Sequence, residues 1–219
     1  MFKKILGKFR ENLLQNTREE KLSKYFKEII CEYHKDQNIK ILDFGSGFQP
    51  KIAFYIHSHL KNNNKNVIIH CYDYYKEIDL KNLNKSSEIN FKSIDQIKKN
   101  SEKYDFVIVS DVLHHIGVER KDNLIQILKN LKLKSEYIII KDHFEFNLIS
   151  RAILIFMDFI GNYYNDVKIP KRYFRENEFS KLIQNANLEV VKKITDKEYY
   201  GKKFLFFNNP KFHFIYLLK

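Results

Sequence analysis

The sequence predicts an α/β fold, a doubly wound and mostly parallel seven-stranded sheet whose last strand is antiparallel. Apolar runs of strand length alternate with helix-like segments along the chain. The first five runs are continuously apolar, which is typical of strands covered on both faces. No helical pattern separates the last two runs, so the final strand can lie antiparallel to its predecessor. The length of 219 residues suits a single domain, 1–219, with a core that needs no disulfide or metal.

The elements follow one another in a regular order. A helical segment is expected at 1–36, where apolar residues such as Phe9, Leu13, Leu22 and Phe26 recur at helical spacing. The strand-like runs are 39–44, 66–73, 88–94, 104–111, 136–142, 188–195 and 212–219. The helix-like segments between them are 50–60, 119–131, 146–160 and 176–186. The apolar residues of 146–160 cover almost the whole helical circumference, so 143–175 is expected to be an insertion or lid after the fifth strand.

Composition narrows the class of partner and the compartment. The net charge is +12, but the lysines are spread along the chain, which favours a solvated basic surface over a nucleic-acid site. For the basic N-terminal helix, packing on the sheet is favoured over binding to a membrane surface. The two cysteines, Cys31 and Cys71, lack metal-type spacing and are expected to be reduced thiols. With no apolar run long enough to span a membrane and no signal-peptide pattern, a cytoplasmic protein is expected.

A ligand site is predicted where the first two strands end. The stretch "KILDFGSGFQP" places Asp43 before a turn made by Gly45, Ser46 and Gly47, and such turns let a ligand approach bare backbone. The second strand ends at Asp73, whose carboxylate can accept hydrogen bonds from both hydroxyls of a ribose. A glycine turn after strand one and an acid ending strand two together indicate a nucleoside ligand.

The nature of that nucleoside follows from two residues beside the turn. A dinucleotide fingerprint requires a third glycine, and Pro50 occupies its place without an N–H for a phosphate. Asp43 would repel a pyrophosphate but suits a ligand that carries an ammonium group. S-adenosylmethionine has an ammonium group, a ribose and no phosphate, and it is therefore the favoured cofactor.

With these motifs the chain resembles the class I S-adenosylmethionine-dependent methyltransferases over nearly its whole length. "ILDFGSG" resembles their glycine-rich motif, "CYDY" their ribose-binding segment, and "YDFVIVSDVLHHI" a segment of small-molecule enzymes related to the ubiquinone/menaquinone methyltransferases. "FGSGFQP" departs from the usual "GCG.G". The resemblance implies a Rossmann-like fold and a small-molecule acceptor, for which an apolar or lipid-linked compound is one option. The cofactor-binding residues that it implies are Asp43, Gly45, Ser46, Gly47, Asp73, Tyr74, Asp95, Asp111 and Val112, with Asp95 near the adenine amine.

Three histidines follow strands four and five and are candidate catalytic residues. His114 and His115 are adjacent, and neighbours at a strand end are expected to point in different directions, so no metal site is expected. A histidine at the transfer site could take a proton from an acceptor, and His143 lies at the same sheet edge in "KDHFEF". A structural role for all three is the alternative.

The sequence thus predicts an S-adenosylmethionine-dependent methyltransferase that acts on a small molecule by direct in-line transfer. Nucleic acid is disfavoured as the acceptor, because neither an Asn/Asp-Pro-Pro-aromatic segment nor a Pro-Cys nucleophile is present. Two alternatives remain open. They are a nicotinamide-dependent oxidoreductase on the same sheet and a catalytically degenerate methyltransferase-like binding protein.

Overall fold

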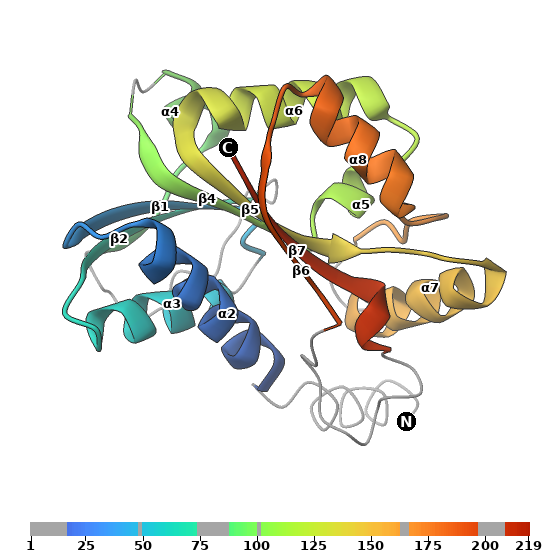
Figure 1. Ribbon diagram of the computed structural model, residues 1–219, viewed down its shortest axis with the longest axis horizontal. Coiled ribbons are helices and arrows are strands. Elements are labelled where there is room, and N and C mark those ends of the chain that lie inside the picture. Colours follow the sequence, from blue (N-terminus) through green and yellow to red (C-terminus); the bar gives the residue numbers. More distant parts are fainter. Residues whose placement is uncertain (1–16, 48–49, 74–87, 100–101, 163–166, 197–208) are drawn as a thin grey trace.

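A twisted seven-stranded sheet with helices on both faces forms the body of the protein (Figure 1). The computed structural model describes residues 17–47, 50–73, 88–99, 102–162, 167–196 and 209–219. The strands are β1 (Asn38–Phe44), β2 (Asn66–Tyr72), β3 (Ile89–Phe91), β4 (Tyr104–Ser110), β5 (Ser135–His143), β6 (Val190–Thr195) and β7 (His213–Leu218). The helices are α2 (Thr17–Tyr33), α3 (Lys51–Lys61), α4 (Ile94–Lys99), α5 (Leu113–Ile116), α6 (Lys121–Lys134), α7 (Leu148–Asn162) and α8 (Glu176–Asn185).

The strand order is β3-β2-β1-β4-β5-β7-β6, which confirms the predicted doubly wound sheet. Strands β1 to β5 pair in parallel, whereas β7 is antiparallel to both β5 and β6. The order reverses between β1 and β4, and parallel sheets bind ligands beyond the carboxyl ends of their strands at such a point. The end of β1 and the end of β4 therefore mark where a site is expected.

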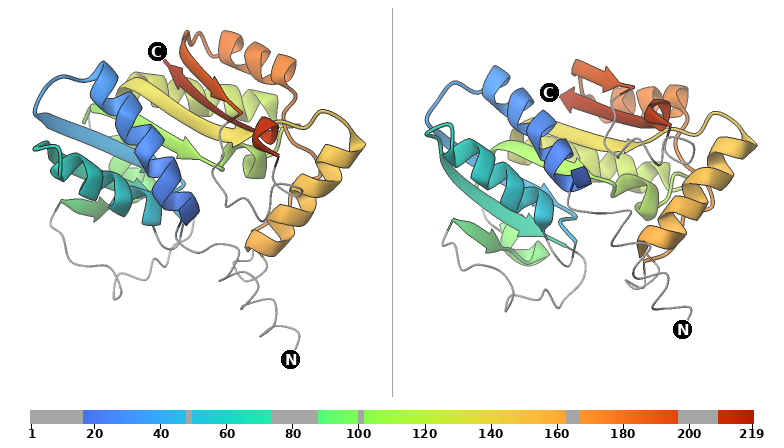
Figure 2. Two further views of the ribbon diagram at one scale, coloured as in Figure 1. Left: turned by 60° about the horizontal axis from the view of Figure 1, so that its bottom comes forward. Right: turned by 90° about the horizontal axis from the view of Figure 1, so that it is seen from below.

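Alternating side chains of the central strands build one apolar core on each face of the sheet. In β4, Phe106 and Ile108 pack towards α2 and α3, whereas Val107 and Val109 pack towards α6 and α8. Figure 2 shows these helix pairs on opposite sides of the strands. Both faces of the strand are thus covered, and this explains why its sequence is continuously apolar rather than alternating.

The largest differences from the sequence-based expectation concern short elements. The helix α5 has four residues and α4 has six, too few for a helical periodicity to be recognised. The predicted third strand, 88–94, is shortened to β3, because Ile94 already begins α4. Of the expected helical segment 1–36, its second part forms α2, and residues 1–16 lie outside the described residues.

The helix α7 follows β5 and lies beyond the carboxyl end of that strand (Figure 1). Leu154 of this helix packs in a small apolar cluster with Tyr173 and Phe212, apart from the two main cores. Among the described helices, none combines the length and apolar character that crossing a bilayer requires. Asp158 of α7 reaches His114 of α5, and this contact places α7 beside the residues that follow β4.

Candidate cofactor and active site

The glycine turn after β1 holds the backbone in a conformation that only glycine adopts readily. Gly45 and Gly47 have φ angles of 83° and 74°. The N–H groups of Gly45 and Ser46 donate to the carbonyl of Tyr72 over 2.7 and 3.0 Å, so the turn is fixed to the end of β2. A Cβ on Gly45 would lie 2.2 Å from Cγ2 of Val112, whereas a Cβ on Gly47 would meet no atom of the described residues within 4 Å. Val112 thus closes one side of the turn, and the backbone at Gly47 remains open to approach.

Asp73 is joined directly to the same turn. The N–H of Gly47 donates to its Oδ2 atom over 2.6 Å. The structure therefore brings Asp43, Gly45, Ser46, Gly47, Asp73 and Val112 together, and their role in binding a cofactor stays a prediction. Tyr74 lies outside the described residues. Asp95 is exposed in the first turn of α4, directly after β3, and its contact with adenine stays a prediction.

Asp43 is a buried acid with an unsatisfied oxygen. Its exposed fraction is 3%, and its Oδ2 atom has no hydrogen-bond partner among the described residues. Burial, reinforced by the nearby charge of Asp73, raises the pKa of Asp43 to about 7. An orphaned buried carboxylate oxygen is costly, and a cationic or hydrogen-donating ligand would relieve that cost.

Asp111, which the sequence placed in the cofactor site, takes part in a buried polar cluster at the ends of β4 and β5. Its Oδ1 atom lies 2.5 Å from Nζ of Lys141 and 3.0 Å from Nε2 of His143, and Arg18 of α2 pairs with its Oδ2 atom. Burial would raise the pKa of Asp111, but Lys141, Arg18 and His143 hold it well below its usual range. Its φ of 57° is uncommon for a residue with a side chain. The predicted role of Asp111 in binding the cofactor stays a prediction.

His114 is enclosed between two carboxylates. It is 0% exposed, with Nδ1 2.5 Å from Oδ1 of Asp142 and Nε2 3.2 Å from Oδ2 of Asp158. Burial alone would lower the pKa of His114, but Asp142 and Asp158 outweigh it and raise the pKa to about 10. His114 is thus the partner of two acids rather than a free base.

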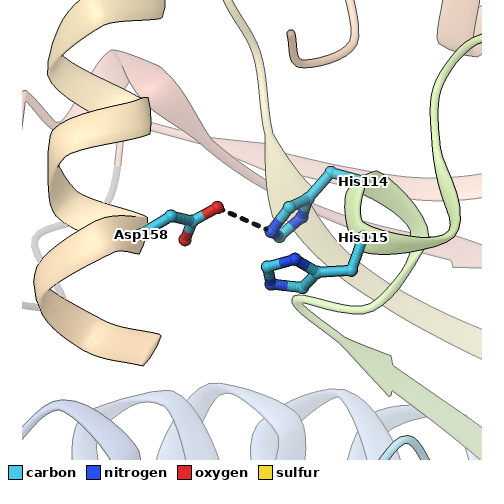
Figure 3. A group of neighbouring side chains, drawn as sticks. All are labelled: His114, His115 and Asp158. Atoms are coloured by element: carbon cyan, nitrogen blue, oxygen red, sulfur yellow. Dashed lines mark ion pairs between the residues drawn. The ribbon is translucent and has the colours of Figure 1, made fainter. Parts of the chain in front are cut away.

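His115 lies beside His114, with the two ring centroids 4.1 Å apart. The expectation that the adjacent histidines diverge is therefore wrong, because the short helix α5 turns both rings to the same side (Figure 3). His115 is partly exposed, and its Nδ1 atom contacts the carbonyl of Lys168 at 3.2 Å. Of the three histidine candidates it is the most accessible to a ligand.

His143 is buried among the side chains of its own strand and its neighbours. Nε2 contacts Asp111 and also lies 3.4 Å from Nζ of Lys141, and the ring packs at 4.7 Å from that of His213. Burial, followed by the charge of Lys141, lowers the pKa of His143. A catalytic role for His143 stays a prediction, and its observed contacts are those of a residue that supports the polar cluster.

Several members of this site were not singled out from the sequence. Asp158 of α7 accepts a hydrogen bond from the Tyr173 hydroxyl over 2.5 Å and also approaches His114. The available signal was a single acid within the apolar run "AILIFMDFI", since a buried or half-buried charge there requires a partner. Lys141, a fully buried lysine in an apolar strand, carries the same kind of signal.

No family model matches the chain. No curated protein matches it by sequence. Solved structures do match, and because their sequence identities to this chain are low, the match concerns the fold alone.

Three methyltransferases among these structures show the extent of the match. An S-adenosylmethionine-dependent methyltransferase from Leishmania major matches with a TM-score of 0.63 and 12% identity over 94% of this chain and 74% of its own. Magnesium protoporphyrin IX methyltransferase from Synechocystis, solved with S-adenosylhomocysteine bound, matches with a TM-score of 0.57 and 13% identity over 92% of this chain and 83% of its own. The CurJ carbon methyltransferase matches with a TM-score of 0.61 and 14% identity over 91% of this chain and 53% of its own. This chain has the fold of the class I S-adenosylmethionine-dependent methyltransferases.

Proposed function

We propose that this chain is an S-adenosylmethionine-dependent methyltransferase that acts on a small molecule. The observation that carries the proposal is the buried, unsatisfied carboxylate of Asp43 beside a glycine turn whose Gly47 N–H is held by Asp73. The comparisons add support, because the matched structures with this fold are methyltransferases, one of them solved with S-adenosylhomocysteine bound.

The residues present fit this cofactor. The ammonium group of its methionyl part offers Asp43 the cationic partner that the described residues do not supply. Asp73 offers carboxylate oxygens for the ribose hydroxyls at the end of β2. The open side of Gly47 lets the ligand lie against backbone, because none of the described side chains comes within 4 Å of the place a Cβ would take.

When bound, S-adenosylmethionine supplies an electrophilic methyl group on a sulfonium, and the acceptor takes it by in-line displacement. The chain has to hold the acceptor in line at near-attack distance and to exclude water. The segment 143–175 is proposed as the lid on the acceptor side. Phe156 and Phe159 of α7 are about half-exposed there, which suits an apolar acceptor.

The alternative of a nicotinamide cofactor is less compatible with the site. A pyrophosphate requires N–H donors and a positive field, whereas this turn is flanked by Asp43 and Asp73 and followed by Pro50. NADH titration, followed by fluorescence, separates this alternative from the proposal. Binding of NADH at micromolar concentration in the absence of any binding of S-adenosylhomocysteine would favour the oxidoreductase.

The deciding experiment is calorimetric titration of S-adenosylhomocysteine into wild type and Asp73→Ala. We expect the substitution to weaken binding by about 1.5–3 kcal/mol, the scale of hydrogen bonds to a charged group. Asp122→Ala, which removes an exposed acid from the first turn of α6, is the matched control and should leave the affinity unchanged. Equal affinity of wild type and Asp73→Ala would contradict the site. Absence of binding by wild type at millimolar concentration would favour the degenerate binding protein.

A further inference from the structure

Three donor side chains converge at the acceptor side of the proposed site. His114 and His115 come from α5, and Asp158 comes from α7 (Figure 3). One ligand atom from each side chain lies within 4.8 Å of the other two. The Nε2 atom of His114 and Oδ2 of Asp158 are 3.2 Å apart. Two donors bound to one tetrahedral zinc ion at about 2.0–2.2 Å would themselves lie roughly 3.4 Å apart, so this pair is already near the spacing of two ligands.

Each of the three side chains is oriented by a partner outside the group. Nδ1 of His114 pairs with Asp142 at 2.5 Å, Nδ1 of His115 contacts the carbonyl of Lys168 at 3.2 Å, and the hydroxyl of Tyr173 donates to Asp158 over 2.5 Å. A carbonyl only accepts hydrogen bonds, so His115 carries its proton on Nδ1 and its lone pair on Nε2. Carboxylate and carbonyl partners on the far nitrogen of a histidine are the usual supports of metal ligands.

The nitrogen of His114 that faces this group lacks a hydrogen bond. Nε2 is buried and makes no hydrogen bond to any of the described residues, since its contact with Oδ2 of Asp158 at 3.2 Å is an ion pair only. The side chain itself is fully buried. Without an ion, this nitrogen holds the proton that the raised pKa of about 10 implies, facing Asp158, and a metal ion bound between the two side chains would replace that proton.

We propose that His114, His115 and Asp158 bind one divalent transition-metal ion of the zinc type. Two imidazoles and one carboxylate form a donor set that zinc accepts, and three protein ligands leave a coordination position for another molecule. The site lies next to the glycine turn, because Val112 contacts that turn and precedes the two histidines by two and three residues. This proposal rests on the proposed function for one point only, which is that the open position takes an oxygen of the methyl acceptor, such as a hydroxyl or carbonyl group.

A structural role for His114 is the competing explanation. A protonated imidazole between Asp142 and Asp158 would join α5 to α7 without any metal. The two explanations make different predictions for His115. Its Nε2 atom would be a ligand of the metal ion, but it takes no part in the contacts of His114 with Asp142 and Asp158.

The test measures metal content and does not require the acceptor. Tag-free full-length protein is stripped with a chelator, dialysed against Zn²⁺ or Co²⁺, and analysed by mass spectrometry of metals and by the visible absorption of bound Co²⁺. We expect about one ion per chain in wild type and in His59→Ala, a control on α3, with affinity reduced by roughly tenfold or more in His115→Ala and Asp158→Asn. Wild type without bound ion, or His115→Ala with unchanged affinity, would overturn the proposal.

Titration of S-adenosylhomocysteine into the same samples separates this proposal from the proposed function. Cofactor binding without metal binding would leave the methyltransferase proposal standing and remove the metal site. Metal binding without cofactor binding would keep the site but remove its role in holding a methyl acceptor. Because His115 is partly exposed, His115→Ala is expected to fold, and its circular dichroism spectrum provides the check.

Discussion

At the residue scale, the charge on Asp43 that would bind the cofactor also destabilises the ligand-free protein. Its raised pKa of about 7 means that the folded protein binds this proton more tightly than the unfolded chain does, whose carboxyl titrates near 3.8. The resulting stability is fully present below about pH 4 and is lost as the pH rises towards 7. Above that pH the buried charge costs the ligand-free protein about 4 kcal/mol.

We therefore expect Asp43→Asn to become more stable relative to wild type as the pH rises. Urea unfolding should show the difference in free energy of unfolding growing by about 3 kcal/mol between pH 5 and pH 8, in favour of the variant. The same variant should bind S-adenosylhomocysteine more weakly, since the partner of the ammonium is lost. Asp122→Asn is the control and should show no such trend. A difference that is independent of pH would mean that Asp43 does not titrate as its burial implies.

At the element scale, the side chains of α7 differ in how deeply they are buried. Leu154 is 3% exposed and packs on Tyr173 and Phe212, whereas Phe156 is 49% exposed. We expect Leu154→Ala to lower the free energy of unfolding by about 2–4 kcal/mol, because it leaves a cavity. Phe156→Ala should cost about 1 kcal/mol or less, as substitutions at exposed positions do. Chemical denaturation of the two variants side by side checks this order.

The same pair of variants tests the lid. If α7 covers the acceptor, Phe156→Ala should leave the affinity for S-adenosylhomocysteine intact and reduce turnover once an acceptor is known. A stability loss for Phe156→Ala equal to that of Leu154→Ala would show instead that Phe156 belongs to a core.

At the scale of the whole molecule, the two apolar cores share their strands. Neither core can lose its packing while the other is retained, since Phe106 and Val107 are neighbours on β4 but face opposite cores. We expect one cooperative unfolding transition, with coincident curves from far-ultraviolet circular dichroism and from tyrosine fluorescence, which is usable because the chain has 14 tyrosines and no tryptophan. S-adenosylhomocysteine at 100 times its Kd should add about 2.7 kcal/mol of stability. Two separate transitions would contradict a single domain.

The sequence predicted correctly those features that depend on a single strand or turn. Each of the predicted strands is present, and the glycine turn and Asp73 meet as expected, because both follow from local chemistry at strand ends. The polar cluster at the ends of β4 and β5 could not be predicted from the sequence. Whether His114 is a free base depends on Asp158, which comes from a helix after the next strand, and Asp111 is compensated by Arg18 from the first described helix. Such pairings are decided by tertiary packing, and neither spacing nor periodicity encodes them.

The position of β7 also determines the order in which the sheet can be completed on the ribosome. Strands β1, β4 and β5 leave the exit tunnel in the order in which they lie side by side, so this half can assemble as it is made. Strand β6 emerges before β7 but is hydrogen-bonded to β7 in the described sheet, and β5 likewise presents an open edge until β7 arrives. A nascent chain that stalls before residue 213 therefore leaves β5 with an open edge and β6 without its partner strand in the described sheet, and open strand edges are the features that chaperones bind and that aggregation exploits.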